Sequence, residues 1–237
     1  MKKYTILLFC FFQLIVHAQN TMFNGIIPVI SQTSRINDKL NFNIFLSTTI
    51  DAFKADIGGI HYPSTDMQLY VQPSVNFRLN QKTQLAGSYT YQRNNPFRDN
   101  FINEHRLWQQ ISYIIPLSKG KIGNRLRFEE RFIQNKLTAS FPLSTRLRYQ
   151  ISYTQPLSLT SKMNGKFYFN CYNEWYFSLS GNKNAFYSEN WTYSGIGYQI
   201  GKKEKIEFGY LFQVAVRNSQ HDLRFLNLLQ IAWITNF

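Results

Sequence analysis

The sequence predicts an all-β fold, a transmembrane antiparallel up-and-down β-barrel that follows a cleaved signal peptide. Three observations predict it. Apolar and polar residues alternate through ten successive stretches from Leu40 onward, the first eighteen residues have the make-up of a secretion signal, and the chain stops on an aromatic residue, Phe237. Alternation with period two indicates strands with one apolar face. A chain that crosses a bilayer on strands must close into a barrel, because every backbone polar group has to be paired in lipid.

Residues 1–18 are interpreted as the signal peptide. Two lysines make a basic start, an apolar run from Ile6 to Val16 follows, and small residues precede Gln19. The apolar run is too short to cross a bilayer as a helix. Cleavage before Gln19 is therefore expected.

Residues 19–38 are predicted to be an N-terminal lead-in or an extra strand. The run from Gly25 to Ile30 could pair as a strand, and a further strand from 52–62 would then raise the strand count to twelve. We prefer ten strands. Residues 39–237 are predicted to be one barrel domain, because no Gly/Ser-rich or Pro-rich linker divides them.

The alternating region begins at Leu40, where Phe42 lies on the apolar face and Asn43 on the polar face. The second strand, near residues 67–79, alternates in the same way but carries Pro73 on its apolar face. Because proline has no N–H, we expect a weakened ladder bond there and a bulge or an irregularity. The other eight strands are expected near residues 83–93, 104–117, 122–134, 143–155, 165–177, 190–200, 205–217 and 222–236.

The connections between these strands alternate in length. Short turns are expected at 80–82, 118–121 and 201–204, and longer loops at 51–65, 94–103, 135–142 and 178–189. Outer-membrane barrels have short periplasmic turns and longer outer loops. With an even number of strands, both termini would lie on the periplasmic side.

Large aromatic residues near the ends of the apolar faces predict that these faces meet lipid. Such rings favour the two membrane interfaces. They are Tyr89, Tyr91, Trp175, Phe177, Trp191 and Tyr193 towards the longer loops, and Tyr153, Phe167 and Trp233 towards the short turns. Glu130, Gln109 and Asn227 fall on the same face, and we expect Glu130 near a strand end, where a charge costs little.

Charge and composition limit the partners and cofactors. The chain has 26 Lys and Arg against 13 Asp and Glu, a net charge of +13. We expect these basic residues to face anionic lipid and lipopolysaccharide, with barrel-assembly machinery as a partner during insertion and no nucleic acid. The protein partner is unknown. Cys171 is the only cysteine beyond the signal, and no metal-spaced cluster or nucleotide-binding motif is present, so no disulfide, metal or cofactor is expected.

The densest charges lie on the polar faces of four predicted strands. This charge cluster consists of Arg106, Arg125, Arg127, Glu129, Arg131, Arg146, Arg148 and Glu174. A hairpin through 135–142 would set Arg131 opposite Arg146 and Glu129 opposite Arg148, and the next turn would set Glu174 near Arg146. Two interpretations stay open. The charges could form salt bridges that fill a narrow lumen, or the surplus arginines could bind or pass an anion.

A catalytic site at the outer rim is the alternative from another functional class. Glu104 and His105 begin one predicted strand, and His221 and Asp222 begin the last. A histidine beside a carboxylate can act as a general base, as a hydrolase would require. Nothing in the sequence brings the two pairs together, so the expectation is that the protein is not an enzyme.

Several stretches around the charge cluster resemble a known family. They are Asn103 to Gln110, Arg125 to Arg131, Arg146 to Tyr149, Tyr172 to Glu174 and Gly195 to Tyr198. Together they resemble the family called domain of unknown function 2490 (DUF2490), over most of residues 40–237. The resemblance implies a β-barrel in the outer membrane of Gram-negative bacteria, mainly Bacteroidota, without an established activity. One departure is visible, because this chain has Asn190-Trp191 where the family tends to carry Asn-Arg.

The sequence therefore predicts an outer-membrane barrel with an Arg- and Glu-lined interior. Its expected role is structural or interactive, or that of a narrow anion-favouring pore.

Overall fold

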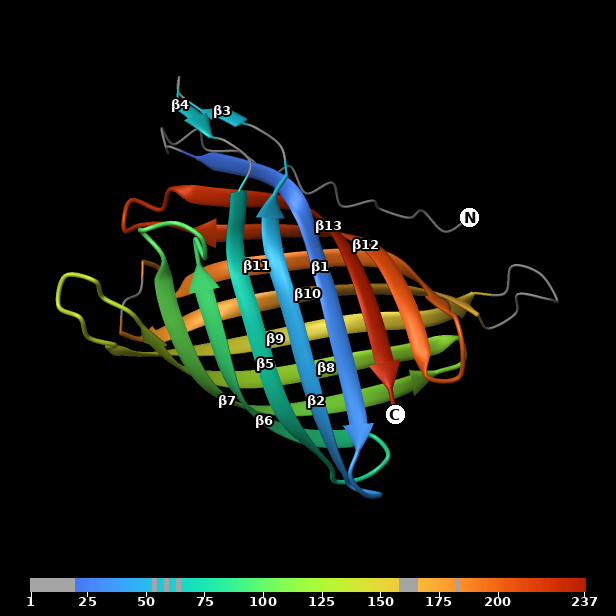
Figure 1. Cartoon of the computed structure of the whole chain (residues 1–237). Coiled ribbons are helices and arrows are strands. Elements are labelled where there is room, and N and C mark those ends of the chain that lie inside the picture. The colour runs from blue at the N-terminus through green and yellow to red at the C-terminus, as the bar shows by residue number, and fades with distance from the viewer. Residues whose placement is uncertain (1–19, 53–54, 58–59, 63–64, 158–165, 182–183) are drawn as a thin grey trace, which may run out of the picture.

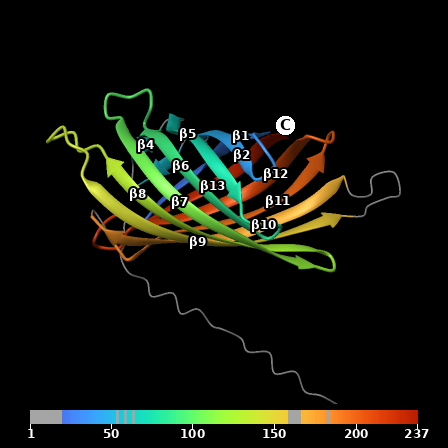
Figure 2. The same cartoon turned by 90° about the horizontal axis from the view of Figure 1, so that it is seen from below.

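The structure is a closed β-barrel beside a small two-stranded sheet (Figures 1 and 2). It is a computed structural model that describes residues 20–52, 55–57, 60–62, 65–157, 166–181 and 184–237. The predicted signal peptide, residues 1–18, lies outside the described residues. Within the described ranges, no helix has the length and apolar character that a membrane crossing requires.

Eleven strands close the barrel, in the order β1-β13-β12-β11-β10-β9-β8-β7-β6-β5-β2. They are β1 (Thr21–Arg35), β2 (Leu40–Asp51), β5 (Thr65–Arg78), β6 (Thr83–Asn94), β7 (Ile102–Leu117), β8 (Gly120–Ile133), β9 (Leu143–Leu157), β10 (Phe167–Ser180), β11 (Tyr187–Gln199), β12 (Glu204–Val216) and β13 (Leu223–Asn236). The remaining strands, β3 (Ala55–Ile57) and β4 (Ile60–Tyr62), pair only with each other. The all-β barrel and its ten alternating strands are confirmed, but the count of ten is wrong, and so is twelve.

The eleventh strand is β1, which lies in the segment predicted as a lead-in or an extra strand. It pairs with β2 in the antiparallel sense and with β13 in the parallel sense, from Thr21 opposite Arg224 to Thr33 opposite Asn236. This parallel seam leaves no barrel strand with an unpaired edge. Its inward side chains explain the docking, because the buried Ile27 of β1 belongs to the same apolar cluster as Leu228 of β13. The barrel is thus not purely antiparallel.

The odd strand count places the start of β1 and the end of β13 at opposite ends of the barrel. One end, here called the short-turn end, carries the connections 36–39, 79–82, 118–119, 158–166 and 200–203. The other, the long-loop end, carries 52–64, 95–101, 134–142, 181–186 and 217–222. Because β1 and β13 are parallel, Thr21 lies at the long-loop end and Asn236 at the short-turn end. The prediction that both termini share one side is wrong, since it required an even number of strands.

The outward face is apolar along most strands, and its side chains are exposed. In β13, Leu229, Ile231 and Trp233 are 55%, 46% and 51% exposed. Glu130 is partly exposed and lies three residues before the end of β8, as expected for a charge on this face. Asn227 is paired on the surface, where its amide donates to Asn24 Oδ1 at 3.0 Å.

Two of the aromatic residues predicted to face lipid, Trp191 and Tyr193, face inward instead. Tyr193 is 1% exposed and its hydroxyl donates to Glu207 Oε1 at 2.7 Å, while Trp191 packs against the inner apolar cluster. Tyr193 can face inward because Gly209 of β12 has no side chain. A Cβ on Gly209 would lie 2.3 Å from the Tyr193 hydroxyl. The prediction that the aromatic residues of β11 face lipid is therefore wrong. Along this strand both faces carry large side chains, so alternation alone does not tell inside from outside.

Candidate functional site

The charge cluster lies inside the barrel, on the neighbouring strands β7 to β10. Successive side chains of a strand point to opposite faces, so residues two apart, such as Arg127 and Glu129 on β8, share the inner face. Glu104, Glu129 and Glu174 are at most 1% exposed, and Arg106, Arg127, Arg146 and Arg148 are at most 6% exposed. Charges this deeply buried are stable only when paired and hydrogen-bonded.

Glu129 is the central acceptor of the cluster. Arg146 donates to its Oε2 through Nε at 2.9 Å and Nη2 at 2.6 Å, and Arg148 donates to its Oε1 at 2.7 Å. Glu174 then accepts from Arg148 Nε at 2.9 Å and from Arg125 Nη2 at 2.6 Å. The two carboxylates thus link three arginines from two strands into one network.

Glu104 is the acceptor of a second group of ion pairs in the charge cluster, nearer the long loops. Arg131 donates to its two carboxylate oxygens at 2.6 and 3.0 Å, and Arg106 donates to Oε1 as well. Arg106 also donates to Gln92 of β6. Such charge-assisted bonds are about twice as strong as neutral ones.

Arg127 is the one buried arginine of the cluster that lacks a close carboxylate among the described residues. Its nearest carboxylate oxygen, on Glu129, is 3.8 Å away. Its Nε and Nη2 donate to the neutral Gln110 at 3.0 and 2.7 Å, and its guanidinium lies 3.8 Å from the centre of the Trp108 ring. Arg127 is therefore held by a neutral amide and a ring, with its one carboxylate contact longer than those of the other arginines.

The predicted cross-strand registers are wrong, by two residues between β8 and β9 and by four between β9 and β10, although the predicted face is right. Glu129 lies opposite Arg146, not Arg148, and Arg131 lies opposite Ser144. Glu174 lies opposite Gln150, and its carboxylate reaches Arg148 and Arg125 instead of Arg146. An even shift, of two or four residues, keeps every side chain on its face, because the side-chain period of a strand is two.

Glu189 of β11 is absent from the predicted cluster but belongs to it. It accepts from Arg146 Nη1 at 3.0 Å. The alternation of β11 contains this signal, because Glu189 shares a face with Trp191 and Tyr193. Because those two rings are predicted to face lipid, Glu189 is assigned to the lipid face as well and is missing from the predicted cluster. Tyr176 of β10 is a second partner outside the prediction, with its hydroxyl 2.8 Å from Arg148 Nη2.

The lumen is filled in the half nearer the long loops. Each of the eleven barrel strands contributes an inward side chain that is at most 8% exposed: Val29, Thr49, Gln72, Thr90, Arg106, Glu129, Arg146, Tyr176, Tyr193, Leu211 and Leu228. The charge cluster fills the β7–β10 side, the apolar cluster fills the side of β1 and β11 to β13, and polar side chains of β2, β5 and β6 lie between them. We call these buried side chains together the plug.

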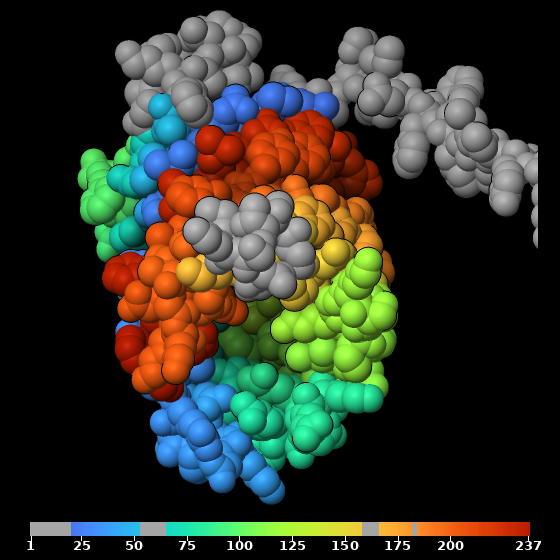
Figure 3. Space-filling view, turned by 90° about the vertical axis from the view of Figure 1, so that its right-hand side faces the viewer, coloured from blue at the N-terminus to red at the C-terminus, as the bar shows by residue number. Residues whose placement is uncertain are grey.

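The half nearer the short turns is more open on the β7–β10 side. Its inward residues Ser112, Gln150, Asn170 and Tyr172 are only partly buried. Figure 3 faces this end and shows a hollow between the strand ends. We call this space the vestibule.

The structure does not bring the four predicted rim residues together. The carboxylate of Glu104 points inward to Arg106 and Arg131, whereas the next residue, His105, points outward and has its Nδ1 2.5 Å from the Tyr89 hydroxyl. His221 and Asp222 lie just before β13, and the strands β1, β2, β5 and β6 separate β13 from β7. No cluster of three potential metal ligands exists among the described residues.

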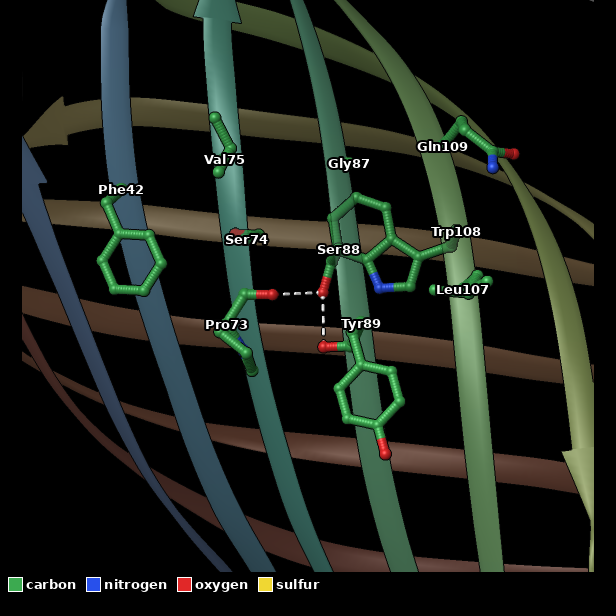
Figure 4. Close-up of a pocket in the computed structure, with 10 residues that line it drawn as sticks. All are labelled: Phe42, Pro73, Ser74, Val75, Gly87, Ser88, Tyr89, Leu107, Trp108 and Gln109. Atoms are coloured by element: carbon green, nitrogen blue, oxygen red, sulfur yellow. Dashed lines mark hydrogen bonds between the residues drawn. The ribbon is translucent and has the colours of Figure 1, made fainter.

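A shallow groove of about 550 Å³ opens around β5 to β7 (Figure 4). Gly87 has no side chain to fill it. At Pro73 the ladder between β5 and β6 is interrupted, as predicted, and Ser88 Oγ donates to the Pro73 carbonyl at 2.5 Å, but no bulge forms. The hydroxyl of Ser88 is thus engaged, and the groove offers little further chemistry.

Comparison with known proteins is consistent with this description. The chain is 27% identical over 149 residues to an uncharacterized protein of Methylorubrum extorquens, a stretch that covers 62% of this chain. The stretch covers 64% of that relative, so the chain spans less than two thirds of its length. Residues 34–224, which include the whole charge cluster, match the family described as protein of unknown function DUF2490. The protein belongs to the DUF2490 family, as the motifs around the charge cluster predict.

Proposed function

We propose that this protein is an outer-membrane β-barrel with a plugged lumen, which serves a structural or interaction role and does not act as an open pore. The observation that carries the proposal is the plug, to which all eleven barrel strands contribute a buried inward side chain. A continuous path for ions would have to break several buried ion pairs at once. Removing one partner of such a pair costs about 3–5 kcal/mol.

The exposed apolar face supports the membrane location. Large apolar side chains are exposed on the outside of nearly every strand, among them Leu85, Ile111, Leu126, Ile151, Ile196, Phe208 and Leu229. A water-soluble barrel would instead hide such residues in its interior. Here the interior contains most of the paired charges, and this arrangement suits a barrel surrounded by hydrocarbon.

The two ends of the barrel suggest its orientation. Short turns are periplasmic and longer loops are external in outer-membrane barrels. On that rule the long-loop end faces outward, where basic residues such as Arg217 and Arg224 would meet the phosphates of lipopolysaccharide or a partner protein. The vestibule would open towards the periplasm.

We propose no catalytic role. The carboxylate of Glu104 is held by two arginines inside the barrel, so it cannot orient His105 on the outside. Four strands separate His221 and Asp222 from Glu104 and His105, so the two predicted pairs do not form a common reaction centre.

The plug predicts that the reconstituted protein does not conduct. In planar bilayers that contain the folded mature chain, we expect no steady single-channel current in potassium chloride, because the charge cluster and the apolar cluster block the lumen. Bilayers with heat-denatured protein provide the control. Regular current steps of uniform size, seen only with folded protein, would contradict the plug and support the narrow-pore alternative.

The odd number of strands predicts opposite sidedness for the two ends of the chain. Single cysteines can be placed in a Cys171→Ser background by Asn20→Cys, Ser219→Cys and Lys202→Cys. In intact cells, a membrane-impermeant maleimide should label the first two and should reach Lys202→Cys only after the outer membrane is permeabilised. If Asn20→Cys instead behaves like Lys202→Cys, the parallel seam between β1 and β13 does not exist in the membrane.

A further inference from the structure

We propose that the vestibule binds a small oxyanion, a carboxylate or a phosphate group, between the guanidinium groups of Arg125 and Arg127. This proposal rests on the proposed function for the source of the ligand. The ligand comes from the periplasm only if the short-turn end faces the periplasm. Four features of the described residues lead to this proposal.

The first feature is surplus positive charge. The ion pairs of the charge cluster involve six arginines, Arg106, Arg125, Arg127, Arg131, Arg146 and Arg148, but only four glutamates, Glu104, Glu129, Glu174 and Glu189. Two positive charges therefore lack a matching acid. Five of the six arginines, Arg125 included, reach a carboxylate within 3.0 Å, and Arg127 does not.

The second feature is unused hydrogen-bonding capacity at Arg125. Its Nη2 donates to Glu174 at 2.6 Å, but its Nε is buried without a hydrogen-bond partner in the described structure. Glu174 is shared with Arg148, so it does not neutralise Arg125 alone. Arg125 and Arg127 lie two residues apart on the inner face of β8 and repel each other. An anion between them would relieve both problems.

The third feature is access. The side chain of Arg125 is 24% exposed, whereas that of Arg148 is 7% exposed. Arg125 lies five residues from the start of β8, on the short-turn side of the plug. The hollow in Figure 3 opens at this end. A solute from the short-turn end therefore meets Arg125 first, with Arg127 behind it.

The fourth feature is the neutral polar lining beside the two arginines. Ser112 of β7 and Gln150 of β9 lie directly opposite Arg125 on the two neighbouring strands. Both can hydrogen-bond an oxyanion without competing for the guanidinium charge. The inward acid Glu207 lies on β12, four strands from β8, and already accepts a bond from Tyr193. Guanidinium groups bind carboxylate and phosphate oxygens with good geometry.

The test is calorimetric titration of the folded mature protein in a zwitterionic detergent, with inorganic phosphate in one arm and succinate in the other. We expect saturable binding in at least one arm, and the arm with the higher affinity identifies the anion class. Arg125→Gln should weaken binding by about tenfold or more, because a hydrogen bond to a charged group is lost. Arg217→Gln removes the same charge at the long-loop end and should leave the affinity unchanged.

A second variant keeps the arginines and every ion pair. Ser112→Glu places a carboxylate opposite Arg125, where it should compete with the ligand and abolish binding while the protein still folds. Unchanged binding in both Arg125→Gln and Ser112→Glu would overturn the site, and so would an equal loss in Arg217→Gln. If the barrel conducts ions but still binds the anion through Arg125, the plug is wrong and the binding site stands. If the barrel does not conduct and does not bind the anion, the binding site is wrong and the plug stands.

Discussion

Replacing Glu129 by glutamine is expected to lower the free energy of unfolding by about 3–5 kcal/mol. The carboxylate of Glu129 is completely buried and accepts three bonds from two arginines, Arg146 and Arg148. Glutamine has nearly the same shape but no charge, so the two guanidinium groups would stay in the barrel with one acid fewer. Urea titration of the protein folded in lipid vesicles, followed by tryptophan fluorescence, measures the change.

The neighbouring residue provides the matched control. Glu130→Gln removes the same charge one position along β8, but on the outward face, where no ion pair holds it among the described contacts. We expect a change close to zero or a slight stabilisation. Equal losses for Glu129→Gln and Glu130→Gln would mean that the charge cluster does not support the fold.

Replacing Ile111 by arginine tests whether lipid or water surrounds the outside of the barrel. Ile111 is 43% exposed near the middle of β7, so in water Ile111→Arg would change stability little. In a bilayer, an arginine on the lipid face costs about 2–4 kcal/mol at the midplane. We therefore expect a loss of this size in vesicles, or failure to insert in cells, measured by the same titration and by outer-membrane fractionation.

Leu117→Arg is the control for depth on the same strand. Leu117 is also exposed on the outward face but is the last residue of β7, where the cost should fall to about 0–1 kcal/mol. A large loss at Ile111 with a small loss at Leu117 is the signature of a bilayer. Small effects at both positions would show that the apolar face does not lie in hydrocarbon.

The strands themselves were predictable, since a half-buried strand imposes period two on its residues. All ten stretches that alternate after Leu40 are barrel strands, with bounds close to those expected. β11 shows the limit of this signal. In the sequence, Trp191 and Tyr193 look like a lipid-facing pair. Tyr193 instead lies inside, over Gly195 and Gly209, which have no side chains. That space exists only once neighbouring strands pair.

The residues of the charge cluster were also predictable, but their partners were not. Alternation places Arg127 and Glu129 on one face whatever the register. Which arginine meets Glu129 depends on the alignment of β8 with β9, and a two-residue shift exchanges Arg148 for Arg146 opposite it. Loop lengths of several residues do not fix that alignment, whereas the backbone ladder of the folded barrel does.

The sequence by itself determined the fold class, the family, the ten alternating strands and the composition of the charge cluster, because each follows from local order along the chain. Only the tertiary structure decided the eleventh strand and which inward side chains are buried together in the lumen. The seam between β1 and β13 joins residues about two hundred positions apart, and the plug needs side chains from all eleven strands at once. Contacts of that range form through closure of the whole barrel, so no single stretch of sequence contains them.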